Sequence, residues 1–202
     1  MSAKSSRRTA SPQFQERYQL FYGGKWVAPK TKKYFPSISP RDGAQLAEVA
    51  LAGEADVDAA YRAAADAFPT WSSLPGVERG KYLYRIARLL QDRAREFAVA
   101  ETLDVGKPIK ESRDFDVPMA AAHFFYHAGW ADKLRWAMPG HDLRPLGVVG
   151  QVIPWNFPLL MLAWKLAPAL ACGNTVVIKP AESASLTCLK FVSILQEAGL
   201  PA

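Results

Sequence analysis

The sequence predicts an α/β protein whose parallel sheet is incomplete. An apolar run from Gly147 to Ile153 and a β-branched run from Thr175 to Ile178 are typical of buried strands, and enough chain for one helix separates them. A crossover of that length joins parallel strands with a right-handed connection. Two parallel strands alone leave open edges and are not stable. We therefore expect the front part of a larger α/β domain, or a partner chain that completes the sheet.

The crossover segment contains signals for the start and the end of its helix. Pro154 and Pro158 end the first strand, because proline cannot continue a hydrogen-bonded ladder. Pro158 also fits the first turn of a helix, where its missing N–H is not needed. The helix is predicted to run to about Ala171, and Gly173 or Asn174 can supply the left-handed residue that ends it.

The rest of the chain is predicted to contain an N-terminal hairpin, a further strand and long helices. Gly23 and Gly24 permit the positive φ angles of a tight turn, which favours a hairpin over Tyr18–Val27, and Ala44–Leu51 is a predicted strand. Apolar residues at helical spacing predict helices over Glu54–Phe68, Val77–Val105, Pro118–Trp136 and Ser183–Ala198. The aromatic run from His123 to Trp130 is interpreted as core packing, not as a ligand site.

Composition and charge exclude several classes of protein. No run approaches the ~18 apolar residues of a membrane span, so no membrane association is expected. The net charge is +6, and +3 of it lies in a basic, apolar-poor tail over residues 1–17 that is predicted to be disordered. The body, residues 18–202, is mildly basic, which favours a solvated surface over nucleic-acid binding. Two cysteines without metal-ligand spacing indicate a reduced, cytoplasmic protein with no metal site.

Three polar side chains are predicted to meet at one edge of the sheet. Ligands of open parallel sheets lie beyond the carboxyl ends of the strands; Asn156 follows one such end, and Lys179 and Glu182 follow the other. Asn156 is either a helix N-cap or an amide donor to a developing oxyanion. Lys179 and Glu182 are either a surface ion pair or a nucleotide subsite, in which the glutamate accepts hydrogen bonds from ribose hydroxyls.

Other signals of chemistry are missing from the sequence. It has no G-x-G-x-x-G and no P-loop, so a pyrophosphate would have to be held in another way. Neither Cys172 nor Cys188 has a histidine base nearby in sequence, and both are interpreted as structural.

Several segments resemble the NAD(P)-dependent aldehyde dehydrogenase superfamily: GQVIPWNFPLLMLAWKLAPALACGNTVVIKPAE, FYGGKWV, ETLDVGKP and HAGWADK, in that family's order. The resemblance covers about residues 18–202, and IPWNFP and VIKPAE are highly specific together. It implies a fold with an incomplete Rossmann-like parallel sheet, an N-terminal hairpin and long helices, which together form part of a cofactor-binding domain.

The resemblance also implies roles for individual residues. Asn156 resembles the asparagine whose amide stabilises the thiohemiacetal oxyanion. Lys179 and Glu182 resemble the pair around the adenosine ribose, and Pro180 lies beside the adenine; Glu182 favours NAD, with NADP possible. The residues that the resemblance assigns to the cofactor cleft are Ile153, Pro154, Trp155, Lys179, Pro180 and Glu182.

The sequence departs from the family in two ways. Family members are more than twice as long, and their nucleophilic cysteine and general-base glutamate correspond to positions beyond Ala202. Cys172 aligns with a small structural residue instead. The segment from Leu134 to Pro145 is shorter than the family's oligomerisation strand, so the usual family dimer is not implied.

The resemblance therefore implies the N-terminal, cofactor-binding part of an enzyme that oxidises an aldehyde to a carboxylic acid. The chain alone is expected to be inactive and to need a complementary C-terminal portion or a homo-oligomeric partner. The alternative is a non-catalytic interaction module, or one half of a split enzyme, built on the same fold. A reading frame that continues past the codon for Ala202 favours the enzyme, whereas a natural stop favours the alternatives.

Overall fold

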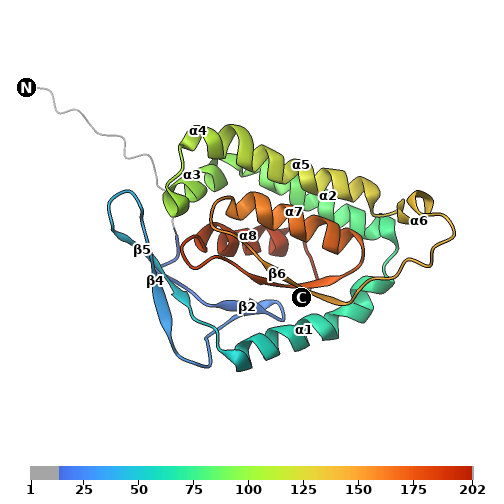
Figure 1. Cartoon of the computed structure of the whole chain (residues 1–202), viewed down its shortest axis with the longest axis horizontal. Helices are drawn as coiled ribbons and strands as arrows, with labels where there is room; N and C mark the ends of the chain where they lie inside the picture. The colour runs from blue at the N-terminus through green and yellow to red at the C-terminus, as the bar shows by residue number, and fades with distance from the viewer. Residues whose placement is uncertain (1–13, 202) are drawn as a thin grey trace, which may run out of the picture.

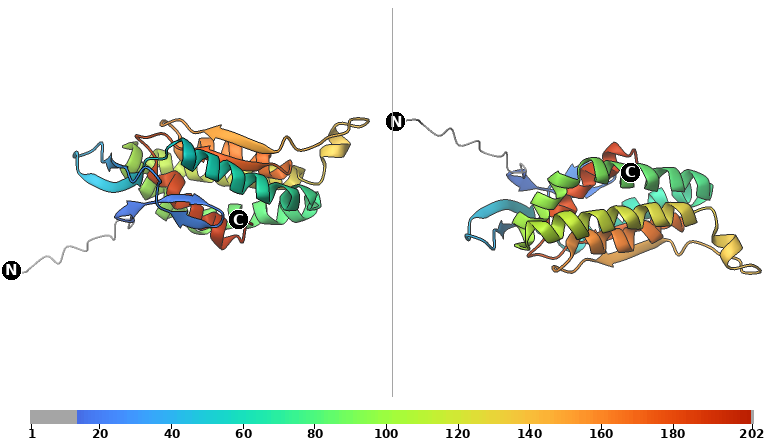
Figure 2. Two further views of the ribbon diagram at one scale, coloured as in Figure 1. Left: turned by 90° about the horizontal axis from the view of Figure 1, so that it is seen from below. Right: turned by 90° about the horizontal axis from the view of Figure 1, so that it is seen from above.

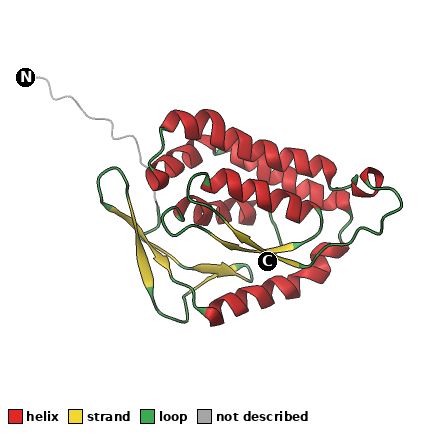
Figure 3. Cartoon of the chain, viewed as in Figure 1, coloured by secondary structure: helices red, strands yellow, loops and turns green. Residues whose placement is uncertain are grey.

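The computed structural model describes residues 14–201 and has a layered α/β arrangement (Figures 1 and 2). The parallel strands β6 (Val148–Val152) and β7 (Thr175–Lys179) lie between α1 (Glu54–Ser73) on one side and α7 (Pro158–Ala171) on the other. Further helices stack beyond α7, and the N-terminal strands lie at one end of the molecule (Figure 3). None of the helices within residues 14–201 is long and apolar enough to cross a bilayer.

The predicted strand–helix–strand unit is confirmed. β6 and β7 pair in parallel, from Val148 opposite Thr175 to Val152 opposite Lys179. α7 begins at Pro158 and ends at Ala171, as the prolines and the following glycine predict. Gly173 has a φ of 83°, the left-handed conformation that ends the helix. Asn174 then accepts hydrogen bonds from the backbone N–H groups of residues 146 and 147, which fixes the start of β6.

The predicted hairpin is also confirmed, although it is shorter than expected. β2 (Leu20–Tyr22) pairs antiparallel with β3 (Lys25–Val27). Gly23 and Gly24 form the turn with φ angles of 57° and 73°, which side chains with a Cβ rarely adopt.

A second small sheet contains the predicted strand over Ala44–Leu51, which is confirmed, and two strands that the sequence pattern does not predict. Its order is β1 (Arg17–Tyr18), β5 (Gln45–Ala50) and β4 (Tyr34–Ile38). Pro36 interrupts the pattern of β4, but an edge strand tolerates a proline because one side of its backbone needs no partner. The tail predicted over residues 1–17 lies outside the described residues except for 14–17, and Arg17 belongs to β1.

The single helix predicted over Val77–Val105 is wrong, because the structure has two helices there. α2 (Gly76–Asp92) and α3 (Ala94–Val105) meet at Arg93, whose φ of −102° and ψ of 18° leave the helical region. Apolar spacing continues across the junction, so the pattern does not reveal the break. Gly106, with a φ of 80°, ends α3 as predicted.

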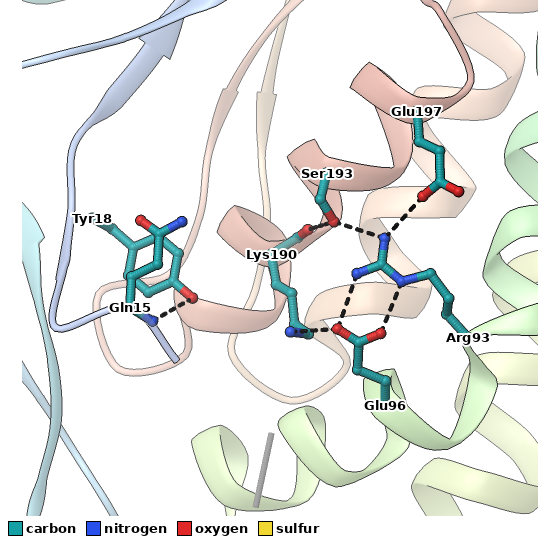
Figure 4. Close-up of polar contacts among 7 residues, drawn as sticks. All are labelled: Gln15, Tyr18, Arg93, Glu96, Lys190, Ser193 and Glu197. Atoms are coloured by element: carbon teal, nitrogen blue, oxygen red, sulfur yellow. Dashed lines mark hydrogen bonds and ion pairs between the residues drawn. The ribbon is translucent and has the colours of Figure 1, made fainter. Parts of the chain in front are cut away.

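The side chain of Arg93 ties this junction to α8 (Leu186–Glu197), as Figure 4 shows. Its guanidinium group donates to Glu96 at 2.8 Å and to the Ser193 hydroxyl at 3.0 Å. Lys190 of α8 lies 2.6 Å from the other oxygen of Glu96. These two cations lower the pKa of Glu96 to about 2, with the Arg93 hydrogen bond as the largest cause.

The helix predicted over Pro118–Trp136 begins and ends earlier in the structure. The short α4 (Ile109–Glu111) leads through a π-helical turn, η1 (Ser112–Asp116), into α5 (Val117–Trp130). Pro118 is the second residue of α5, just after the π-helical turn, where the α-helical ladder is already interrupted. After α5 the chain turns, and α6 (Leu134–Ala137) is a separate short element.

The boundaries of two other predicted helices also differ. α1 continues five residues beyond Phe68, with Pro69 inside it. α8 starts at Leu186, after the predicted start at Ser183, because residues 181 and 184 first form an isolated β-bridge.

The main core lies among α2, α3, α5, α7 and α8. Its largest fully buried side chains include Leu83, Ile86, Leu90, Phe97, Phe124 and Phe191. The prediction that the aromatic run of α5 packs in the core holds for Phe124 and is wrong for Tyr126 and Trp130, which are 60% and 37% exposed. Helical periodicity turns these two side chains away from the buried face.

Candidate functional site

Two loops leave the same edge of the parallel strand pair. The Asn156 loop (residues 153–157) follows β6, and the Glu182 loop (residues 180–185) follows β7. The N–H of Ile153 donates to the carbonyl of Lys179 at 2.9 Å, so the two loops begin side by side. The structure thus brings the predicted site segments together at the carboxyl ends of the strands, where open parallel sheets bind ligands.

Asn156 does not cap α7. The N-cap residue of the helix is Phe157, whose side chain makes no cap hydrogen bond. Asn156 itself is exposed, one residue before the cap position. The interpretation of this asparagine as a helix cap is therefore wrong, and its amide lies at the surface of the site.

The other residues of the Asn156 loop differ in how far their side chains are exposed. Ile153 is 1% exposed and packs in the main core, so only its backbone faces the site. Pro154 is half-buried, and Trp155 is exposed over 64% of its surface. A wall along this loop would therefore consist of the proline and tryptophan side chains.

Lys179 and Glu182 form an exposed ion pair, with 2.5 Å between Nζ and Oε1. The hydrogen bond from Lys179 lowers the pKa of Glu182 below its usual range. An ion pair this exposed stabilises a fold little. Pro180 lies half-buried beside the pair, and the bridge between Ala181 and Ala184 closes the turn that carries Glu182.

Both cysteines have thiols that resist ionisation. Burial raises the pKa of Cys188 well above its usual value, and Glu101 and Asp104 raise it further. Burial also raises the pKa of the half-buried Cys172. A nucleophilic cysteine needs a lowered pKa, so these environments support the structural interpretation of both residues. Within residues 14–201, no group of three His, Cys, Asp or Glu side chains could hold a metal ion.

The sequence pattern does not single out a set of buried charged residues directly behind the two loops. Glu101 and Asp104 of α3 contact the first turns of α7 and α8. Lys107 places its ammonium group 3.9 Å from the ring centroid of Phe157. The ETLDVGKP segment that contains all three residues carries the family resemblance, yet nothing in its helical spacing shows that its carboxylates reach other helices.

Taken together, the fold is a partial Rossmann-like α/β domain, and the Asn156 loop and the Glu182 loop leave the same edge of its sheet. The family model described as "Aldehyde dehydrogenase family" matches residues 26–202, and the chain belongs to that family.

The chain is similar to full-length aldehyde dehydrogenases over nearly all its length. It is 42% identical to aldehyde dehydrogenase family 2 member B4, mitochondrial, of Arabidopsis thaliana, over 99% of this chain and 39% of the relative. The structure of indole-3-acetaldehyde dehydrogenase in its apo form has a TM-score of 0.88 at 39% identity and covers 95% of this chain and 46% of that one. PnpE in complex with nicotinamide adenine dinucleotide has a TM-score of 0.84 at 41% identity, over 91% of this chain and 39% of that one. The chain thus spans about 40% of the length of its curated relatives.

Proposed function

We propose that this chain supplies the nucleotide cleft and the oxyanion donor of an NAD-dependent aldehyde dehydrogenase. The observation that carries the proposal is the pairing of Ile153 with Lys179, which sets the Asn156 loop beside the Glu182 loop. An amide and an ionised carboxylate then share one edge of the sheet. The relatives are aldehyde dehydrogenases, so the reaction is the oxidation of an aldehyde to a carboxylic acid.

In this proposal the Glu182 loop holds the adenosine end of the cofactor. Glu182 accepts hydrogen bonds from the ribose hydroxyls, and Lys179 donates to neighbouring oxygens. The exposure of both groups and the lowered pKa of Glu182 keep the carboxylate charged and accessible. A charged glutamate repels a 2′-phosphate, which favours NAD, and the NAD-bound neighbour PnpE supports this choice.

The Asn156 loop serves the chemical step. NAD supplies the hydride acceptor of the reaction when it is bound. Asn156 donates its amide hydrogen to the oxygen of the substrate, which gains negative charge once a thiolate has added to the aldehyde. Its position just outside the helix leaves the amide free for this contact. Pro154 and Trp155 shield one side of the cleft.

We infer that the thiolate and the general base come from a complementary C-terminal portion or from a partner chain. The raised pKa values of Cys172 and Cys188 argue against either as the nucleophile. The competing function is a non-catalytic module or one half of a split enzyme. We expect a cytoplasmic location, because both cysteines are free.

The proposal is tested by joining this chain, at Ala202, to the matching C-terminal part of the Arabidopsis relative. The fusion should form NADH when an aldehyde is added, whereas the 202-residue chain alone should not. A fusion that folds and binds NAD but never oxidises an aldehyde would favour the non-catalytic module. Aldehyde-dependent NADH formation by the isolated chain would show that a nucleophile within it has been missed.

A further inference from the structure

Two buried carboxylates on α3 each reach the first turn of another helix. Glu101 and Asp104 lie about one helical turn apart, near the C-terminal end of α3, and both are almost fully buried. Neither belongs to the two loops of the proposed site. Burying a carboxylate is costly, so each needs compensating hydrogen bonds.

Asp104 supplies the N-terminal cap of α8. Its Oδ2 accepts hydrogen bonds from the backbone N–H groups of Leu186 at 2.8 Å and Thr187 at 3.2 Å. The N-cap residue of the helix, Ser185, makes no side-chain cap hydrogen bond and donates its hydroxyl to the carbonyl of Ala181. The first turn of α8 is therefore satisfied by a residue more than eighty positions away in the sequence, not by its own loop.

Glu101 does the same for α7. Its Oε1 accepts a hydrogen bond from the backbone N–H of Leu159 at 3.4 Å, and Phe157 at the N-cap position has no polar side chain to compete. Lys107 lies against the ring of Phe157 and forms a buried ion pair with Asp116 at 2.6 Å. Glu101 of α3 and Lys107, two residues beyond its end, therefore both contact the start of α7.

The contacts of Glu101 and Asp104 lie close to the ends of the two proposed loops. Leu159 follows Asn156 by three residues, and Leu186 follows Glu182 by four. One helix, α3, therefore contacts the residues at which both loops end, while the paired strands set where both loops begin. We propose that Glu101 and Asp104 are positioning residues that hold the Asn156 loop and the Glu182 loop in a fixed arrangement relative to each other. This inference rests on the proposed function, which gives the two loops their roles.

The ionisation of Glu101 and Asp104 offers a way to follow their contacts, because the pKa values of both carboxyls lie near neutral pH. Burial raises the pKa of Glu101 to about 7 and that of Asp104 to about 6. The charged or titratable groups that act on Glu101 are Lys107, Asp116 and Cys188; those that act on Asp104 are Tyr18 and Cys188. The amides that these carboxyls bind should therefore report their ionisation individually.

The test uses backbone amide resonances of the 202-residue chain between about pH 5 and pH 8.5. The signals of Leu186 and Thr187 should titrate with a midpoint near that of Asp104, and the signal of Leu159 with a midpoint near that of Glu101. Amides that do not titrate, or that titrate with other midpoints, would contradict the raised pKa values of the two carboxyls, and the variants below test their positioning role.

Variants that remove or keep the oxygen acceptor then test positioning through ligand binding. Asp104→Leu should shift the signals of the Glu182 loop and weaken NAD binding roughly tenfold, whereas Asp104→Asn keeps an oxygen that caps the helix and should retain binding. Glu101→Met should shift the Asn156 signals and leave those of Leu186 unchanged. Glu96→Gln is the matched control, since Glu96 joins α3 to α8 without touching either first turn, and it should alter neither loop.

A folded Asp104→Leu chain that binds NAD as tightly as the wild type would contradict the positioning role, even if its melting temperature falls. Failure of the proposed function would give a different result: the Lys179→Ala variant would bind NAD as tightly as the wild type does. In that case the loop signals of the two variants still decide whether the carboxylates position the loops.

Discussion

The structure removes the helix-cap interpretation of Asn156, and this changes the result that we expect for its variants. In the fusion described above, Asn156→Ala should lower the turnover rate by roughly 10²–10³, the range for losing one oxyanion donor. Stability should change little, because Asn156 is not the N-cap of α7. Asn156→Asp should be equally impaired, since it places a negative charge against the oxyanion. Steady-state rates and melting temperatures of both variants provide the measurement, and an active Asn156→Asp enzyme would end the assignment.

Glu101 should make stability fall as the pH rises. Its pKa of about 7 in the folded chain exceeds its ordinary value of 4.5, so the folded state binds the proton more tightly. The resulting stabilisation is complete below about pH 4.5 and is lost as the pH rises through 7, by up to about 3 kcal/mol at 1.36 kcal/mol per unit. Asp104 acts in the same direction between its ordinary pKa of 3.8 and about 6.

Glu101→Gln should therefore gain stability relative to the wild type between pH 5 and pH 8. Urea unfolding at several pH values measures this difference. His123, whose pKa is lowered by burial, has the opposite slope but cancels between the two proteins. Parallel stability curves for both proteins would show that Glu101 does not titrate in this range.

For single residues, the sequence identifies the exposed residues of the proposed site but not the buried residues that contact the ends of its loops. Asn156, Lys179 and Glu182 follow strand ends, and the 2.0-residue and 3.6-residue periodicities suffice to bring strand ends together. Glu101 and Asp104 act across helices, through contacts that depend on how α3 packs. No local pattern encodes such a contact, so only the structure reveals it.

Between elements, the close approach of α2 and α5 depends on glycine. A Cβ added to Gly76 would lie 2.2 Å from the carbonyl oxygen of Ala131, which is backbone and cannot move aside. Gly76→Ala should therefore destabilise the chain by about 1–3 kcal/mol through overpacking. Gly129→Ala is the matched control, because its Cβ would meet only the Tyr84 hydroxyl at 3.7 Å. Equal melting temperatures for the two variants would refute this account of the contact.

The helix boundaries show where sequence patterns fail at the scale of elements. The order of strands and helices is largely predicted, because apolar spacing and proline or glycine punctuation are local. The break at Arg93 is not predicted, because apolar spacing continues across it, and the contacts of Arg93 with Glu96, Ser193 and Glu197 depend on how the helices pack. Likewise, aromatic side chains point to several faces of α5, and which of them are buried depends on the neighbouring helices.

At the scale of the whole molecule, we propose that this chain by itself forms the adenosine side of an NAD cleft. Strands β6 and β7 form a sheet of only two strands, but the loops that follow them are already braced by α3. The nucleotide contacts should therefore exist before any further strand is added. Catalysis should require the remaining portion of the fold.

The most direct test is to titrate NAD and NADP into the 202-residue chain and into its Glu182→Gln variant. The wild type should prefer NAD, and the variant should lose about 1 kcal/mol of that preference, or roughly fivefold, the repulsion of unit charges about 4 Å apart in water. Glu78→Gln is the matched control, because Glu78 pairs with Lys81 at 2.7 Å in the same i,i+3 geometry on α2. It should leave both affinities unchanged. Equal NAD and NADP affinities in the wild type, or identical behaviour of the two variants, would contradict the account.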